Sequence, residues 1–381
     1  MKKQTKIIIS IVFLFVIALI IFLAFFYKGE ISIALRVPAT IKINGKEFKN
    51  ITSFSKKLSP NNYELIASKA GYKEYKQKVR VEAFKKISID INLEPKAEEV
   101  MSGVSDAYFL NGSVYYYSNQ TLNKLDLKNK KTTTISDTLP FSVKKVFWSK
   151  NTKKALLFSN EARPQTAIFN SGTKEVKILD GEYAPTGDWS EDGQTVLIGS
   201  FQLEGFFSLN ILNGNDLQKK EVSPRVLPFD LLKWAEKQNL GLLSSYGMDE
   251  GCLFQILDLN NGGTAIFNSG DCVTGAVFTK NSVLYEIRDF EGKKSSLNIL
   301  DLSTKRSKKI FDGEIKKWAF LDEGVVVLAS NKVQVLSING DKEKEYQTNV
   351  DELTDIQNFY IFENELFLES NDSLYIVGLK E

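Results

Sequence analysis

The most informative feature for chemistry is that none of the 381 residues is histidine. A Ser-His-Asp or Cys-His nucleophile, a histidine-liganded zinc and a histidine proton shuttle are therefore excluded. The sequence also lacks a glycine-rich phosphate loop, a Cys-x-x-Cys pair, a nucleophile elbow and an EF-hand-like run of aspartates. We therefore expect no catalytic residues, no cofactor and no metal site.

Acidic pairs in two loops are the remaining candidates for carboxylate chemistry. Asp249 with Glu250, and Asp289 with Glu291, are of the type that a histidine-free hydrolase or a Ca²⁺ site would use. A glycosidase needs two carboxylates placed across a cleft, which sequence cannot show. Solvated loops are the simpler interpretation of both pairs.

The two cysteines, Cys252 and Cys272, are too few for a disulfide framework or a four-cysteine metal site. They lie symmetrically about an Asn260-Asn261-Gly262-Gly263 turn. A hairpin centred on that turn would place them side by side, so we expect a disulfide if the region is exported. Two separate buried thiols are the alternative.

The elements that would position these residues begin with an apolar run from Ile7 to Tyr27, which covers roughly 30 Å as a helix, the thickness of a bilayer core. The run is longer than the apolar part of a signal peptide and lacks a small-x-small cleavage site. Lys2, Lys3 and Lys6 precede it, so we expect a single-pass signal anchor in the cell membrane, with residues 1–28 forming a cytoplasmic tip and the span. Residues 28–381 would then be extracytoplasmic.

Charge is unevenly distributed along the chain. The formal net charge is only +2, but residues 28–95 carry 14 basic and 7 acidic side chains, which leaves the region after residue 95 acidic. Nucleic-acid binding is not indicated. The basic region predicts attraction to anionic headgroups or wall polymer, and a lysine-rich solvated face is the alternative. Its lysines are at 42, 46, 49, 56, 57, 69, 73, 76, 78, 85 and 86.

Residues 29–95 alternate with period two and predict a small β-sandwich. Short strands are expected at 31–35, 40–44, 63–68, 76–82 and 87–93, with a hairpin turn at Asn44-Gly45. The segments VPATIKINGKEF, LSPNNYEL, AGYKEYKQKVRV and ISIDINLEP, within Val37–Pro95, resemble the PEGA domain, a β-sandwich of exported prokaryotic proteins. That resemblance implies a spacer or adhesion module without catalysis.

An internal repeat fills residues 106–381. An aromatic residue, a turn and an apolar strand recur at Tyr108, Trp148, Trp189, Trp234, Phe278, Trp318 and Tyr360, at spacings of 40, 41, 45, 44, 40 and 42 residues. Four short strands per repeat predict a β-propeller, whose periodic aromatics pack between blades. We expect seven blades, with six or eight as alternatives.

The last repeat has room for only three strands. Residues 96–105, a linker, would supply the fourth and close the ring. The Trp-Ser-Glu-Asp-Gly segment at 189–193 resembles the TolB-like and WD-type bacterial propellers, which implies the fold but no ligand. The expected fold class is therefore all-β, after the N-terminal transmembrane helix.

The loops joining second and third strands lie on one rim of a propeller, where binding residues gather. The interaction candidates there are Arg163, Glu204, Asp249, Glu250, Arg288, Asp289 and Glu291. We expect a membrane-anchored extracytoplasmic binding or scaffold protein whose partner is an envelope protein, a glycan or an anionic wall polymer. The alternatives are a histidine-free propeller enzyme acting on extracellular glycans or peptides, and a passive part of an envelope complex.

Overall fold

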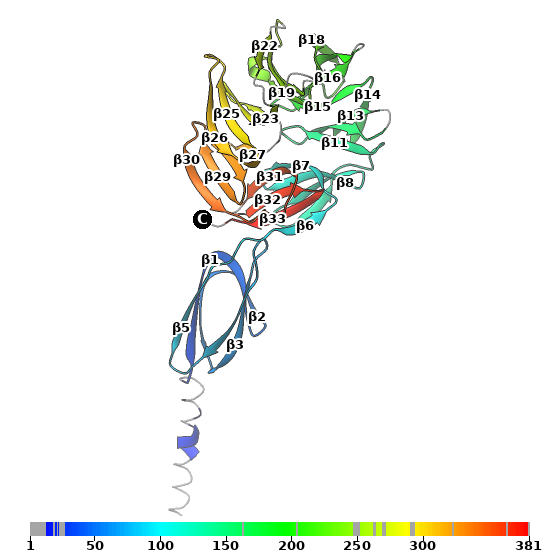
Figure 1. Ribbon diagram of the computed structural model, residues 1–381. Helices are drawn as coiled ribbons and strands as arrows, with labels where there is room; N and C mark the ends of the chain where they lie inside the picture. The colour runs from blue at the N-terminus through cyan, green and yellow to red at the C-terminus, as the bar shows by residue number, and fades with distance from the viewer. Residues whose placement is uncertain are drawn as a thin grey trace, which may run out of the picture. The chain divides into compact units, whose positions relative to one another are not determined.

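The computed structural model describes two compact units, residues 1–98 and 99–379 (Figure 1). The described ranges are 27–161, 164–202, 205–246, 252–261, 264–268, 272–289, 294–321, 324–362 and 365–379, with 13–17, 20 and 22 near the N-terminus. The predicted anchor at 7–27 lies largely outside these ranges. Within them, no helix is both long and apolar enough to cross a membrane.

The first unit is one continuous five-stranded sheet. Its strands are β1 (Gly29–Ile43), β2 (Lys46–Leu58), β3 (Asn61–Ser68), β4 (Tyr75–Val81) and β5 (Lys86–Ile91). The first half of β1 pairs in parallel with β5, and its second half pairs with β3. Both halves contribute side chains to one core, among them Ile31, Ile33, Ile41 and Ile43. All five strands expected for the small β-sandwich are thus connected through β1 and share this one core.

Strand β1 also corrects two strand predictions. Residues 31–35 and 40–44 were expected as separate strands, and Pro38 lies between them. They form one strand, with a register shift between Ala34 and Ala39 that accommodates the proline. The predicted turn is present, with Asn44 and Gly45 at φ of 44° and 80°. The long strand β2 was not predicted at all.

In its described residues, the second unit contains seven four-stranded sheets, numbered 1 to 7 here along the chain (Figure 1). Sheet 1 comprises β7 (Ser105–Leu110), β8 (Ser113–Ser118), β9 (Thr121–Asp126) and β10 (Lys131–Thr134). Sheet 2 comprises β11 (Val143–Trp148), β12 (Lys154–Ser159), β13 (Thr166–Asn170) and β14 (Glu175–Leu179). Sheet 3 comprises β15 (Tyr183–Trp189), β16 (Thr195–Phe201), β17 (Phe207–Asn213) and β18 (Lys219–Val226). Sheet 4 comprises β19 (Leu231–Ala235), β20 (Leu240–Tyr246), β21 (Cys252–Asp258) and β22 (Thr264–Asn268), and a 3-10 helix at Glu236–Gln238 follows β19. Sheet 5 comprises β23 (Cys272–Phe278), β24 (Ser282–Arg288), β25 (Ser295–Asp301) and β26 (Ser307–Gly313). Sheet 6 comprises β27 (Ile315–Leu321), β28 (Gly324–Ala329), β29 (Lys332–Ser337) and β30 (Lys342–Gln347). Sheet 7 contains β31 (Ile356–Phe362), β32 (Glu365–Ser370) and β33 (Ser373–Gly378).

Sheet 7 takes its fourth strand from far back in the chain. Strand β6 (Glu98–Ser102) follows β33 in the strand order, inside the segment expected to close the ring. The first strands of sheets 6, 7 and 1 contact in turn, as do those of sheets 1 to 5. Trp318 of sheet 6 packs against Leu284 of sheet 5. These contacts complete a ring of sheets, and the all-β propeller-type architecture is confirmed.

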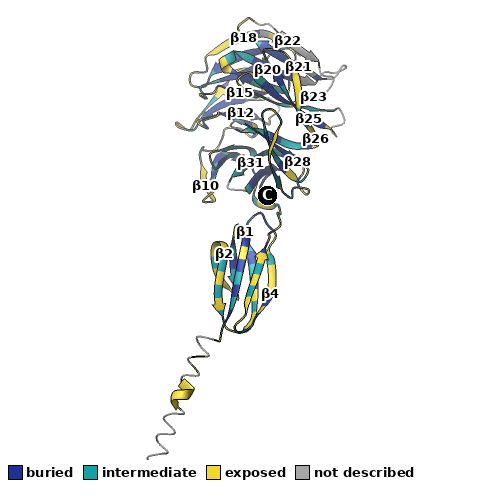
Figure 2. Ribbon diagram, turned by 90° about the vertical axis from the view of Figure 1, so that its left-hand side faces the viewer, coloured by how far each residue is buried: buried dark blue, intermediate teal, exposed yellow. Residues whose placement is uncertain are grey.

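The space between sheets is filled by apolar side chains, and strands near it are largely buried (Figure 2). All four tryptophans are buried, and Trp189 is among the largest fully buried side chains. The four tryptophans do not occupy the same position within their strands, however. Trp148 and Trp189 end β11 and β15, whereas Trp318 lies in the middle of β27. The repeat therefore predicted burial correctly but not the position within each strand.

Candidate functional site

A cavity of about 1250 Å³, called the channel below, lies inside the ring of the second unit and is lined largely by its first strands. Each sheet's first strand contributes a polar or charged residue to its lining: Asp106, Lys145, Asp188, Lys233, Thr274, Lys317 and Asn358 for sheets 1 to 7. Acidic and basic residues alternate over the first four of these positions. The channel is therefore a polar, charge-lined cavity rather than an apolar pocket.

Four acidic side chains at or beside the channel are already used as acceptors between sheets. In each case a carboxylate of one sheet accepts a hydrogen bond from the next sheet around the ring. The bonds run from Val146 N to Asp106 (2.8 Å), from Trp234 N to Asp188 (2.8 Å), from Trp318 Nε1 to Glu286 (3.1 Å) and from Ala107 N to Glu369 (2.9 Å). These carboxylates join sheets 1 to 2, 3 to 4, 5 to 6 and 7 to 1.

Other polar contacts join the remaining sheets. The indole of Trp189 donates to the carbonyl of Phe147 at 2.8 Å, joining sheets 2 and 3. Lys316 donates to the carbonyl of Val350, in the segment that leads into sheet 7, at 3.1 Å. Sheets 4 and 5 are joined by the Ser244 hydroxyl, which donates to the Val273 carbonyl at 2.9 Å. Polar bonds thus hold the inner ring together and leave the channel lining fixed.

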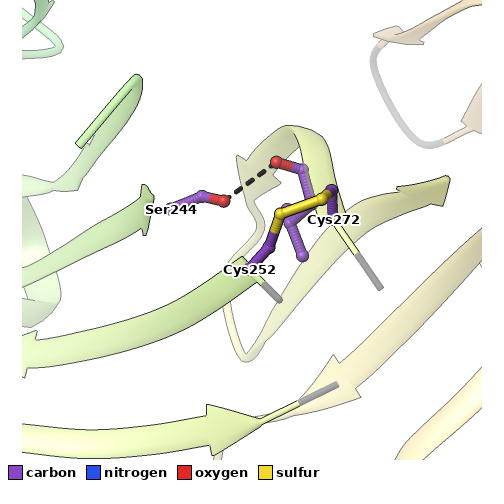
Figure 3. Close-up of a disulfide and its surroundings, with 4 residues drawn as sticks. Ser244, Cys252 and Cys272 are labelled. Carbon is purple, nitrogen blue, oxygen red and sulfur yellow. Dashed lines mark hydrogen bonds between the residues drawn. A yellow bond between two sulfur atoms is a disulfide. The ribbon is translucent and has the colours of Figure 1, made fainter. Parts of the chain in front are cut away.

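The disulfide lies at the junction of sheets 4 and 5, beside Ser244 (Figure 3). Cys252 and Cys272 are bonded, with Cα atoms 4.8 Å apart. The expected location across a hairpin is wrong. Strand β22 ends at Asn268, which pairs with Leu253, so Cys272 belongs to β23 in the next sheet. The bond therefore crosslinks two sheets rather than two strands of one hairpin.

Burial shifts the pKa of two channel-lining groups, Asp106 and Lys317, and of Glu369 behind the lining. It raises the pKa of Asp106 to about 7; the Val146 N–H opposes this shift, and the nearby Glu369 carboxylate adds to it. Burial likewise raises the pKa of Glu369, against hydrogen bonds from Asn358 and Ala107. Burial lowers the pKa of Lys317. Asp106 also has a left-handed backbone, with φ of 51°, which the surrounding contacts must maintain.

Two of the predicted interaction residues can be placed. Arg288 ends β24 and lines the channel, where its Nε donates to Glu286 at 2.7 Å and its guanidinium donates to the Ile315 carbonyl at 3.2 Å. Asp289 begins the following loop and accepts a hydrogen bond from the Lys294 N–H at 3.1 Å. Arg163, Glu204, Asp249, Glu250 and Glu291 lie outside the described residues.

The sequence did contain a signal for the channel lining. In three repeats a charged residue directly precedes the buried tryptophan, as in Asp188-Trp189, Lys233-Trp234 and Lys317-Trp318. The loops were instead favoured as the binding face, and the first strands were assigned only to the core.

Comparison with known proteins supports the division into units. Residues 34–97 match the family model of the PEGA domain, and residues 84–225 match that of eukaryotic translation initiation factor eIF2A. The first unit is therefore a PEGA domain, and the chain continues into an eIF2A-like, WD40-type propeller region. No curated protein matches the chain at the level required for significance.

A solved structure has the same fold as the second unit. The structure titled "Oligogalacturonate lyase in complex with manganese" matches with a TM-score of 0.55 and 9% identity, over 75% of this chain and 93% of that chain. This likeness shows the fold alone. In the part of the chain that the structure describes, no group of three or more Cys, Asp or Glu side chains is placed to hold a metal ion.

Proposed function

We propose that this chain is a membrane-anchored extracytoplasmic binding protein, in which the PEGA domain is a spacer and the propeller holds a ligand at its central channel. The observation that carries the proposal is the channel itself, about 1250 Å³ in volume and lined by charged side chains from the first strands. A cavity of this kind on a rigid ring suits ligand binding. Its partner would be an envelope component.

Three features support an anchored, exported location. The run from Ile7 to Tyr27, preceded by three lysines, has the length and charge bias of a signal anchor. The disulfide between Cys252 and Cys272 is of the kind that persists in oxidising compartments. At the base of the first unit, Tyr27 packs edge-on against the exposed ring of Phe84, with centroids 5.9 Å apart. Aromatic rings of this type suit a membrane surface.

Binding is favoured over catalysis because three carboxylates at or beside the channel, one buried and two half-buried, are engaged in holding sheets together. Asp106, Asp188 and Glu369 each accept a backbone N–H from a neighbouring sheet. A general base must be free to reach substrate. Carboxylates that fix the ring serve the shape of the site instead.

Photo-crosslinking in intact cells tests this function. A photoreactive residue would replace Glu314, which is exposed and lines the channel, or Lys131, which is exposed on the outermost strand of sheet 1. We expect an ultraviolet-dependent adduct from position 314 and none from position 131. Equal adducts at both positions, or an adduct from position 131 alone, would contradict the channel as the binding site.

A further inference from the structure

Three lysines occupy equivalent positions on alternate sheets. Lys145, Lys233 and Lys317 each directly precede the residue that donates the hydrogen bond to a carboxylate of the preceding sheet. Those residues are Val146, Trp234 and Trp318, in sheets 2, 4 and 6. Because the sheets form a ring, the three lysines are distributed around the channel that all of them line.

These lysines lack the protein partners that the neighbouring acids have. In the described part of the chain, no hydrogen bond or ion pair joins the ammonium group of Lys233 or Lys317 to another residue, and Lys145 lies over the ring of Phe147 with its Nζ 5.0 Å from the centroid. Asp106 and Asp188 are bonded to backbone N–H groups, and Glu286 is bonded to Arg288 and Trp318. The positive charges are thus left without bonded counterions.

The surroundings of Lys317 make the lack of a bonded counterion energetically unfavourable. The residue is half-buried, and burial is the main cause that lowers its pKa; the nearby Glu286 and Glu369 carboxylates oppose this shift, whereas Arg288 and Lys233 add to it. A half-buried cation without a bonded anion is unfavourable, and an anion entering the channel would relieve it. The acids of the channel-lining loops, Glu314, Asp351, Asp355 and Asp372, are all exposed. Water and salt screen these acids, and the equally exposed Lys145, more effectively than they screen the half-buried Lys233 and Lys317.

We propose that the channel binds an oligoanion that presents two or more carboxylate or phosphate groups to Lys145, Lys233 and Lys317. This inference rests on the proposed binding function and names the ligand class. The channel volume of about 1250 Å³ is larger than that of most small-molecule pockets, so it has room for several linked charged units. Charge-assisted hydrogen bonds from three directions would fix such a ligand along the channel axis.

Titration calorimetry on the full-length chain in a neutral detergent at low salt tests the proposal. Citrate and tripolyphosphate, which carry three carboxylates and a triphosphate chain, are the probes, and maltotriose is the neutral control. The variant K145Q/K233Q/K317Q removes the channel charges and keeps most of each side chain. The matched variant K128Q/K220Q/K344Q removes three exposed lysines of the propeller that do not line the channel.

We expect at least one anion to bind the unchanged protein and maltotriose not to bind. The channel variant should lose about tenfold or more in affinity, and the matched variant less than about twofold. Binding of citrate alone would specify carboxylates as the ligand groups, and binding of tripolyphosphate alone would specify phosphates. Tryptophan emission, which comes only from the propeller, verifies that both variants fold.

Equal losses in both variants would show that the anions are attracted by surface charge and would overturn the proposal. Failure of both anions to bind would also overturn it. The photo-crosslinking result at position 314 distinguishes a wrong ligand class from a wrong binding function. An adduct there without anion binding would retain the function and discard the ligand class.

Discussion

Replacing Glu369 by alanine is expected to lower the free energy of unfolding of the propeller by roughly 2–4 kcal/mol. Glu369 is fully buried, and one carboxylate oxygen accepts hydrogen bonds from Ala107 N at 2.9 Å and from Asn358 Nδ2 at 2.8 Å. Alanine would leave the buried Ala107 N–H without an acceptor and would remove the acceptor of the half-buried Asn358 amide. The loss falls on the junction of sheets 7 and 1, where the ring closes.

Glutamine at position 369 separates the hydrogen bonds from the charge. Its amide oxygen can accept both bonds, and its amide nitrogen takes the place of the carboxylate oxygen that has no hydrogen-bond partner. Because burial raises the pKa of Glu369 in the folded state, the stability that protonation supplies is present at low pH and is lost as pH rises through the folded pKa. The Glu369→Gln variant should therefore be within about 1 kcal/mol of the unchanged protein near pH 5 and at least as stable near pH 8. Asp106 has a raised pKa of about 7, so its ionisation also lowers the free energy of unfolding as pH rises from about 4 to about 7.

Urea unfolding followed by tryptophan fluorescence measures these effects, because all four tryptophans lie in the propeller. The exposed Glu343 provides the matched control, and Glu343→Ala should change stability by less than about 0.5 kcal/mol. If Glu369→Ala and Glu369→Gln were equally destabilising at every pH, the assigned role of the hydrogen bonds to Glu369 would be wrong.

Removing the disulfide is expected to cost about 3 kcal/mol, the value for a closed loop of about twenty residues in the chain-entropy model. The bond joins residues 20 apart and crosslinks sheets 4 and 5, so the Cys252→Ala/Cys272→Ala variant should unfold at lower urea concentration. Both cysteines are buried, which makes substitution a cleaner test than a reducing agent.

The matched control is Ser244→Ala, which removes the neighbouring hydrogen bond to Val273 but leaves the covalent bond intact. We expect this change to cost about 1 kcal/mol. Thiol trapping before lysis should find no free cysteine in the unchanged protein. Two reactive thiols in the folded protein, with stability unaffected by the double substitution, would contradict the assigned crosslink.

Much of the fold could be predicted because its signals are local. The aromatic repeat predicted seven units, and the short last repeat indicated that residues before β7 would complete it; β6 pairs there with β33. Asn44-Gly45 predicted a turn that the structure contains. The turn depends on two adjacent residues, and the repeat and its incomplete last unit are visible as a periodic pattern along the chain.

Apart from the charged residues that precede three tryptophans, the channel lining could not be predicted from alternation because the first strands contain register shifts. Shifts occur between Val143 and Lys145, between Val273 and Gly275, and between Ile315 and Lys317. A one-residue shift reverses which side chains face inward, so simple alternation does not identify the residues that line the channel. The partners are also distant in sequence: Glu369 bonds to Ala107, and only ring closure brings them together. The Cys252–Cys272 location was missed for a related reason, since β22 is shorter than a symmetric hairpin requires.

Labelling of single cysteines in intact cells tests most directly whether the propeller is displayed outside a membrane anchor. Lys128 is exposed in the propeller, and Lys3 precedes the apolar run. With Cys252 and Cys272 disulfide-bonded, a membrane-impermeant maleimide should label Lys128→Cys in intact cells and Lys3→Cys only after the cells are permeabilised. Labelling of Lys3→Cys in intact cells, with Lys128→Cys protected until permeabilisation, would contradict the account.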